Sequence, residues 1–358
     1  MDAKGFAEKE IAPHVARLEE DIPFRLELFR KMAKANLFLL AVSKESGGAF
    51  SDTLSYLLAL KEIAKVDAGI SVAMAVTNMV AECIATHGSE KQKKQFIPKI
   101  SSGENIPLSF ALTEKNAGSD AKNIASTAHR QGDCFKINGE KQFITNGDLA
   151  KILLVFAKTE KGISAFLVDH NASGLSVTKK ERKLGLLTAN LVSLKFEDTS
   201  GELLGHEGEG FKLALSALDS GRLSIAAQAI GIAEAAYEAA LNFAKNREQF
   251  GHAISENQAI AFKLADMHVK LSASRLLLEK AALLKDEGKP FSLEASEAKL
   301  YCSEACNEIT AEALQIHGGY GYIKDYPVEK YFRDARVTTL YEGTSEIQRI
   351  VISRSILK

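Results

Sequence analysis

Hydrophobic positions along the chain change their period twice. In the first third, apolar residues recur at helical spacing, as in LSYLLALKEIAKV (54–66). From Ser109, short runs alternate apolar and polar residues between turn signals, and from Gly208 the helical period returns. This order predicts a mostly helical α+β fold with an N-terminal helical domain (1–108), a middle β-barrel or sandwich domain (109–207) and a C-terminal four-helix bundle (208–358).

Local signals predict where several elements begin and end. SEKQKKQFIPKI (89–100) starts with a serine cap, whereas KESGGAF (44–50) breaks the helical pattern and indicates a loop. Asn138-Gly139 lies between two alternating runs of DCFKINGEKQFITNG and predicts a hairpin turn. Ser345 and Gln348 have capping-box spacing, which predicts a helix from Ser345 with Glu342 in the turn before it.

Charge and cysteine content exclude several classes of function. Lys and Arg number 45 against 46 Asp and Glu, and no Lys/Arg block gives the basic footprint of a nucleic-acid-binding protein. The four cysteines have no zinc-site spacing, so we expect no metal centre and a reducing compartment. The most apolar stretch, 68–85, is interrupted by polar residues and indicates a buried helix, not a membrane span. The charged start, with no apolar signal core, favours the cytoplasm, or the mitochondrial matrix for a mature form.

Five short stretches could carry chemistry, although each also has an ordinary structural interpretation. Thr113, Gly118 and Ser119 in FALTEKNAGSD suit a ring edge or a phosphate, or simply form a polar turn. Phe143 and Thr145 in FITNG suit a planar ring or a plain strand end. The remaining three stretches are NREQFGHAISENQ (246–258), LQIHGGYGY (314–322) and LYEGTSEIQR (340–349).

These three stretches leave the same choice open. Arg247 could pair with a phosphate or lie in a solvated interhelix turn. Gly318-Gly319 could admit a close neighbour or end a helix. Glu342 could act as a base or complement the dipole of the following helix.

Taken together, the motifs resemble the acyl-CoA dehydrogenase family, most closely its short-chain, butyryl-CoA-type members. The resemblance covers almost the whole chain, in the family's order and close to its spacing. It implies a FAD-dependent oxidoreductase acting on a short-chain acyl-CoA in fatty acid oxidation, a homotetramer, and an electron-transfer flavoprotein as acceptor. The motifs that carry it are LTEKNAGSD, INGEKQFITNG, LDSGRLSIAAQAIGIA, NREQFG, QIHGGYGY, YFRDAR and YEGTSEIQR.

The resemblance also assigns residues to the ligands. It gives FAD one set from the same subunit: Phe110, Leu112, Thr113, Gly118, Ser119, Phe143, Ile144, Thr145, Thr344 and Glu346. It gives FAD a second set from a neighbouring subunit: Arg247, Phe250, Gln258, Gln315, Ile316, Gly318 and Gly319. It gives the acyl-CoA substrate Ser119, Asp219, Arg222 and Gly343.

Glu342 receives the role of catalytic base from the same resemblance. The α-hydrogen of a thioester is weakly acidic, so its removal needs a base at the carbon and donors at the oxygen. Family members place a glutamate at one of two positions, and the second is Gly221 here. The resemblance therefore implies that Glu342 takes the α-proton while the β-hydrogen leaves as hydride to the flavin. An apolar site should raise the pKa of this glutamate.

The chain also departs from the family's pattern. Lys115-Asn116 replaces a usual Pro-Gly, Phe143 replaces a tryptophan, and the segment after KLG lacks the usual Arg-Gly-Ser. These departures keep a rival open, in which the acyl group is carried on a protein or oxygen is the acceptor. A DNA-binding member with flavin would be favoured by a basic C-terminal extension, whereas this sequence ends in SRSILK. Met79 and Glu82 are candidates for the floor of the acyl pocket.

Overall fold

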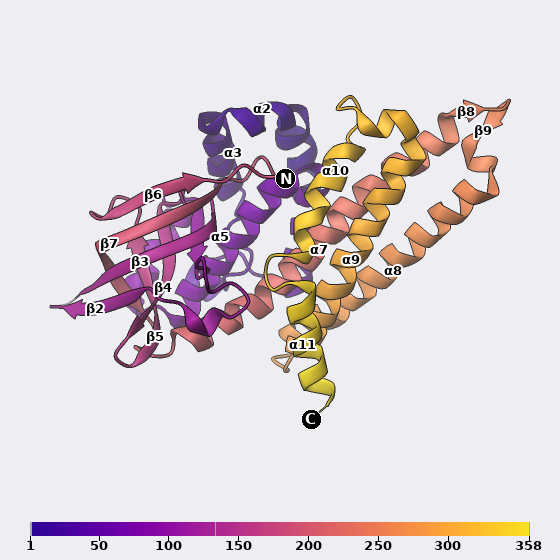
Figure 1. Ribbon diagram of the computed structural model, residues 1–358. Coiled ribbons are helices and arrows are strands. Elements are labelled where there is room, and N and C mark those ends of the chain that lie inside the picture. The colour runs from indigo at the N-terminus through magenta and orange to yellow at the C-terminus, as the bar shows by residue number, and fades with distance from the viewer. Residues whose placement is uncertain (1, 133, 358) are drawn as a thin grey trace.

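The computed structural model describes residues 2–132 and 134–357. Met1, Lys358 and Asp133, which begins the predicted strand segment DCFKINGEKQFITNG, lie outside the described residues. A β structure lies at one side of the molecule, the N-terminal helices pack beside it, and long helices run away from it to a distant tip (Figure 1). The predicted order of helices, strands and helices is therefore confirmed.

The N-terminal helices except α2 (Val15–Glu20) begin at side-chain caps. The Asp52 carboxylate accepts from Ser55 N (2.6 Å), the Asp67 carboxylate accepts from Ile70 N (2.8 Å), and Ser89 forms a complete capping box. The loop at 44–50 holds only a short 3-10 turn, Lys44–Ser46. The helices are α1 (Ala3–Phe6), α2 (Val15–Glu20), α3 (Ile22–Lys34), α4 (Thr53–Val66), α5 (Ala68–His87) and α6 (Glu90–Ser101).

Helix α5 is the helix in the described part of the chain that is long and apolar enough to cross a membrane. Of its most apolar window, 83% is buried inside the fold. Its Asn78 side chain donates to the Leu37 carbonyl (2.8 Å), so the polar residues of this helix are also used internally. The helix has the surroundings of a core helix.

The middle strands close into a barrel. The strands β4, β5, β7, β3 and β2 pair in a ring that returns to β4, while β1 adds to β4 and β6 to β7. Alternate residues point inward and form a separate apolar core that includes Phe135, Phe166 and Phe196. The strands are β1 (Leu108–Ala111), β2 (Thr127–Gln131), β3 (Cys134–Thr145), β4 (Ile152–Thr159), β5 (Gly162–Asp169), β6 (Leu175–Lys180) and β7 (Leu191–Leu204).

The predicted hairpin at Asn138-Gly139 is wrong, because β3 continues through both residues. Gly139 has φ +143° at a bulge against β7, and a Cβ there would lie 2.4 Å from Ser126 Oγ. Asn138 donates to the Asp198 side chain of β7 (2.8 Å). Asn-Gly favours unusual backbone geometry, which here makes a bulge and not a turn. β7 likewise continues to Leu204 through the glycine at 201.

Three long helices form the C-terminal bundle: α7 (Gly210–Asn246), α8 (Gln258–Asp286) and α9 (Ser292–His317). The shorter α10 (Val328–Ala335) and α11 (Ser345–Ile356) both pack on α9. Small strands β8 (Glu248–Gln249) and β9 (His252–Ala253) mark the distant tip (Figure 1). The predicted helix stop at Gly318 is correct, with φ +58° there.

The helix α11 begins as expected but with a different cap. Thr344, not Ser345, is the N-cap, and its Oγ1 accepts from Ile347 N (3.4 Å). The Gln348 amide does not complete a capping box. It donates instead to the carbonyls of Glu342 (3.1 Å) and Gly343 (2.9 Å). Gln348 therefore stabilises the turn before the helix, which is the turn that carries Glu342.

Candidate active site

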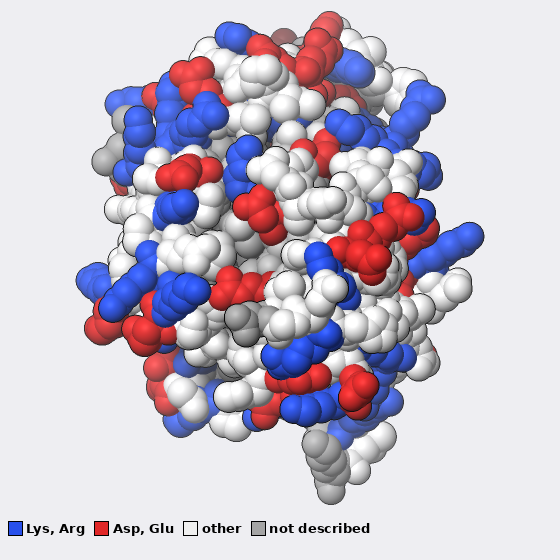
Figure 2. Space-filling model, turned by 90° about the vertical axis from the view of Figure 1, so that its left-hand side faces the viewer, with Lys and Arg blue, Asp and Glu red and all other residues white. Residues whose placement is uncertain are grey.

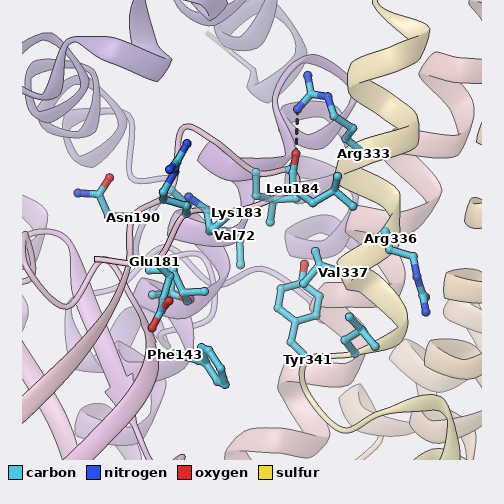
Figure 3. A pocket seen from close by; sticks show the side chains of 17 residues that line it. Val72, Phe143, Glu181, Lys183, Leu184, Asn190, Arg333, Arg336, Val337 and Tyr341 are labelled. Carbon is cyan, nitrogen blue, oxygen red and sulfur yellow. Dashed lines mark hydrogen bonds between the residues drawn. The ribbon is translucent and has the colours of Figure 1, made fainter. Parts of the chain in front are cut away.

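A cavity of about 300 Å³ lies where the barrel meets the C-terminal region. Its walls come from the end of β3, from α5, from the segment 181–191 between β6 and β7, and from residues 333–341 (Figure 3). Phe143 and Tyr341 face it from opposite domains. Its lining is mainly apolar and aromatic, with Thr145 and a few charged groups at the edge, which suits a planar ring with a polar rim.

The barrel side of this cavity joins residues that are distant in sequence. Gln142 N donates to Thr113 O (2.8 Å), which places the end of β1 beside Phe143. Phe143 has φ +59° at a second bulge of β3, and its side chain is 54% exposed, so the ring points away from the barrel core. Thr145 also lines the cavity.

Other residues of the first FAD set are placed differently. Ile144 is buried in the barrel core and Leu112 in the larger core, so neither side chain lines the cavity, and Phe110 packs on Phe156 with ring centroids 4.9 Å apart. Gly118 and Ser119 lie in an exposed loop. Glu346 is exposed on the first turn of α11, where Thr344 serves as the cap.

Lys115 and Asn116, which depart from the usual Pro-Gly, lie in the loop that follows β1. The two residues form the tip of a tight turn closed by paired hydrogen bonds between Glu114 and Ala117. Neither of them has a positive φ. Below the tip, Glu114 accepts from the buried ammonium group of Lys141 (2.7 Å) and from Ser126 Oγ (2.6 Å). The loop is therefore held from its base, and its exposed side is open to a ligand.

The far wall of the cavity, at 184–190, was not found from the sequence. The other two domains hold it: Asp334 accepts from Leu186 N (2.6 Å), Thr188 Oγ1 donates to Asp67, and Lys330 Nζ bridges Asp67 (3.1 Å) and Asp334 (2.6 Å). A Cβ at Gly185 would lie 2.5 Å from a backbone oxygen of α10. The only sequence signal was the missing Arg-Gly-Ser, which did not predict how this segment is positioned.

Glu342 directly follows Tyr341 in the chain, but it is not itself among the residues that line this cavity. It has φ +52° and Gly343 has φ +88°, a strained turn that only its surroundings can hold. The carboxylate of Glu342 lies against Gly221 of α7, where an added Cβ would come within 2.3 Å of Oε2. The Oε2 atom is buried and has no hydrogen-bond partner among the described residues. The carboxylate is thus aimed into the protein without a structural partner.

Burial raises the pKa of Glu342 to about 7, although the positive charges of Arg222 and Lys299 act in the opposite direction. Arg222 of α7 is tied to Asp219 in an ion pair and lies 3.4 Å from Ser296 Oγ. Asp219 also accepts from Ser292 Oγ (3.0 Å). Asp219 and Arg222, two of the residues predicted to contact acyl-CoA, therefore form one hydrogen-bonded unit near Glu342.

The second FAD set lies far from this cavity. Arg247, Ile316, Gly318 and Gly319 line another cavity, of about 470 Å³, at the distant tip of the bundle. Phe250 is 95% exposed nearby, and Gln258 and Gln315 are also exposed. His317 stacks on Phe243 with ring centroids 4.3 Å apart, and both residues line this cavity. Within one chain, the first cavity thus lies between the barrel and the bundle, whereas the second lies at the distant tip of the long helices (Figure 1).

Comparison with known proteins gives the class of protein. Three domain profiles match in order: acyl-CoA dehydrogenase N-terminal domain at 2–104, middle domain at 109–199 and C-terminal domain at 208–357. The short-chain specific acyl-CoA dehydrogenase of Clostridium acetobutylicum is 42% identical, covering 99% of this chain and 95% of that protein. Subunit CarC of the caffeyl-CoA reductase-Etf complex of Acetobacterium woodii is 43% identical, covering 99% and 96%.

The structural comparison agrees. Butyryl-CoA dehydrogenase from Megasphaera elsdenii superposes with a TM-score of 0.95 at 40% identity, covering 99% of this chain and 96% of that one. The chain belongs to the acyl-CoA dehydrogenase family. It is a FAD-dependent oxidoreductase, and the sequence predictions of family, fold, enzyme class and cofactor are confirmed.

Proposed function

We propose that the protein oxidises a short-chain acyl-CoA thioester to the trans-2-enoyl-CoA, with Glu342 as the base. The observation that carries the proposal is the Glu342 carboxylate itself, with Oε2 buried and without a hydrogen-bond partner and its pKa raised to about 7. A general base works best when its pKa lies near the working pH. FAD, when bound beside Phe143 and Thr145, supplies the acceptor for the β-hydrogen as hydride.

The residues around Glu342 divide the remaining tasks. Gly221 leaves room for the carboxylate, and Gly343 lets the chain turn where a Cβ would lie 2.6 Å from Gln348 Nε2. Arg222, Asp219 and Ser119 remain the proposed contacts to the CoA part, and Gly343 a proposed wall of the acyl pocket. The carboxylate of Glu342 takes the α-proton. The carboxyl group that results is neutral, which suits the desolvated site.

A short substrate is supported by a polar crossing between α5 and α7. The Gln228 amide of α7 donates to Ala68 O (2.6 Å) and Ser71 Oγ (2.8 Å) of α5, and accepts from Tyr341 OH. Gln228 lies seven residues from Gly221 along α7, which is about 10 Å at 1.5 Å per residue. We propose that the acyl chain extends from Glu342 between these helices and that Gln228 ends its pocket.

This assignment replaces part of the expectation for the pocket floor. Met79 Sδ would lie 3.4 Å from a Cβ at Gly221, so Met79 is near the base. Glu82, by contrast, is engaged by Lys285 (2.9 Å), which also donates to Ser220 Oγ (2.8 Å). We therefore keep Met79 as a wall of the pocket and place Glu82 beside Ser220, at the end away from Gln228, so Glu82 is not the floor.

A homo-oligomer, with the tetramer as the proposed form, would bring the two FAD sets together. The tip cavity with Arg247 suits the phosphates and adenine of a FAD whose ring lies in another subunit. The outer face of α8 supports assembly, because it exposes an apolar stripe at seven-residue spacing. The stripe residues are Phe262, Val269, Leu276 and Leu283.

The proposed partner that accepts the electrons is an electron-transfer flavoprotein, in keeping with the Etf complex of the CarC relative. Lys, Arg, Asp and Glu are interspersed over the face in Figure 2, without a single-sign patch for nucleic acid. The proposed location is the cytoplasm or the mitochondrial matrix, with domain borders near residues 108 and 207.

Replacing Glu342 with Gln tests the assignment of the base. The variant should bind FAD and acyl-CoA, yet lose at least about a thousand-fold in flavin bleaching on anaerobic mixing with butyryl-CoA, because an amide cannot take a proton. Glu287→Gln, an exposed carboxylate at the end of α8, is the matched control. Bleaching of Glu342→Gln at the wild-type rate would return Glu342 to the role of a dipole-complementing residue before α11.

A further inference from the structure

Lys299 is a lysine in the bundle that lacks an ordinary structural role. It lies on α9 and is 0% exposed, although lysines are rarely fully buried unless they are paired. Among the residues that the structure describes, no carboxylate lies within ion-pair distance of Lys299. Its hydrogen-bond acceptor is the carbonyl of Gly343, at 2.6 Å. A buried ammonium group is thus directed at the turn that carries Glu342.

That turn needs an external restraint. Glu342 and Gly343 both have positive φ, and for glutamate this backbone costs on the order of 1 kcal/mol. The Gly343 carbonyl accepts from Lys299 Nζ and from Gln348 Nε2, so it is held from α9 and α11 together. Without these donors, the buried carbonyl would lose its partners and the turn could relax.

The charge of Lys299 also acts on Glu342. The charged groups near the Glu342 carboxylate are Arg222 of α7 and Lys299 of α9, and both favour its ionised form. Arg222 is already neutralised by Asp219. Lys299 in turn faces Arg222, Glu304 of α9 and Glu346 of α11, while Tyr56 of α4 is near both Glu342 and Glu82 of α5. Burial lowers the pKa of Lys299 to about 8, so it keeps most of its charge at pH 7.

We propose that Lys299 is a positioning residue for the base: it fixes the Glu342–Gly343 turn through the Gly343 carbonyl and keeps the Glu342 side chain in its carboxylate form. This inference rests on the proposed role of Glu342. It gives Lys299 two separable contributions, one from a hydrogen bond and one from a charge. Lys299 remains protonated while Glu342 takes the α-proton, so it does not itself exchange a proton with the substrate.

Two substitutions separate the contributions. Lys299→Gln removes the charge but keeps an N–H donor, and Lys299→Met removes both. In both variants we expect the pH of half-maximal flavin bleaching with butyryl-CoA to rise by about one unit, because an opposite charge has been lost. Lys299→Met should in addition lower the plateau rate at high pH, about ten-fold or more, because the turn is no longer fixed. Lys299→Arg should keep the pH profile.

The controls distinguish this inference from a general loss of structure. Lys31→Met, on α3 and remote from the site, should leave the profile unchanged. FAD affinity, followed by quenching of flavin fluorescence, should change less than three-fold in all variants. In FAD-free protein, the difference in thermal stability between Glu342→Gln and its Glu342 parent should keep growing to a higher pH in the Lys299→Met background, because the folded pKa of Glu342 rises while its unfolded value does not.

The results that would contradict the role of Lys299 differ from those that would contradict the role of Glu342 as the base. A profile that does not move in Lys299→Gln and Lys299→Met, with FAD affinity retained, overturns the role of Lys299 even if Glu342→Gln is inactive. An active Glu342→Gln overturns the base assignment whatever the lysine variants do. If Lys299→Met fails to fold, the Lys299→Gln profile alone decides, because its side chain keeps the hydrogen bond.

Discussion

Glu342→Gln should make the FAD-free protein more stable, and increasingly so as the pH rises. Burial raises the pKa of Glu342 from its ordinary value of 4.5 to about 7. A carboxyl group whose pKa is higher in the folded chain opposes folding once the pH exceeds its unfolded value. The penalty grows until the pH passes the folded value and is then constant. A glutamine has no such penalty, so the variant reveals it.

The size of the effect follows from the two pKa values. A shift of about 2.5 pH units corresponds to about 3 kcal/mol, which should be present in full at pH 8 and reduced to about 1 kcal/mol at pH 5. The buried amide has its own desolvation cost, but this cost is the same at both pH values and does not affect the difference.

The assay is thermal denaturation of FAD-free wild type and variant at one protein concentration from pH 5 to pH 8. The concentration is fixed because assembly also contributes to the midpoint. Glu287→Gln serves again as the control and should show no trend, because its carboxylate is exposed. If the difference in stability between wild type and Glu342→Gln does not depend on pH, the reasoning that the site destabilises the charged form of Glu342 is refuted.

Two further predictions concern the ends of the ligands. Arg247→Ala should weaken FAD binding at least ten-fold, measured by flavin fluorescence, since it removes a proposed phosphate partner at the tip cavity. The pH dependence of flavin bleaching should not change. Unchanged FAD affinity would show that the assignment of Arg247 is wrong. Gln228→Ala should move the rate maximum to acyl-CoA chains at least two carbons longer, because it removes the polar crossing between α5 and α7; the same chain-length profile would place the end of the pocket elsewhere.

The period of the hydrophobic pattern was sufficient to predict the three-part architecture, because long amphipathic helices and alternating strands are set by local sequence. Local signals were weaker where tertiary contacts choose between two geometries. Asn138-Gly139 fits a tight turn and a bulge equally well in isolation, and the contact of Gly139 with Ser126 decides for the bulge. The cap at Thr344 was missed for a similar reason, because Gln348 is used by the Glu342 turn.

The candidate site shows the same limit. The sequence could nominate Glu342, Phe143 and Thr145 as candidates because they lie in recognisable motifs. Lys299 could not be found, since nothing in SLEASEAKLYCSEAC distinguishes a lysine directed at a strained turn from one in solvent. The wall at 184–190 was also missed, because it depends on charges from the N-terminal and C-terminal domains that are far apart in sequence. Pairings across long sequence separations are not visible in a single sequence.

Gly221 offers the last test, because the structure limits how a second position for the base could be used. A Cβ at Gly221 would lie 2.3 Å from Glu342 Oε2 and 3.0 Å from its Cδ, so side chains at both positions cannot keep the present geometry. Gly221→Glu alone should therefore displace Glu342 and lose most of the bleaching rate. The combination of Gly221→Glu with Glu342→Gly removes the clash, and glycine adopts the positive φ at 342 without strain. If the site requires only a carboxylate near the α-carbon, the double variant should bleach at least ten-fold faster than Glu342→Gly alone under anaerobic mixing. A double variant no faster than Glu342→Gly, with FAD and acyl-CoA still bound, would show that the base must be held on the turn before α11.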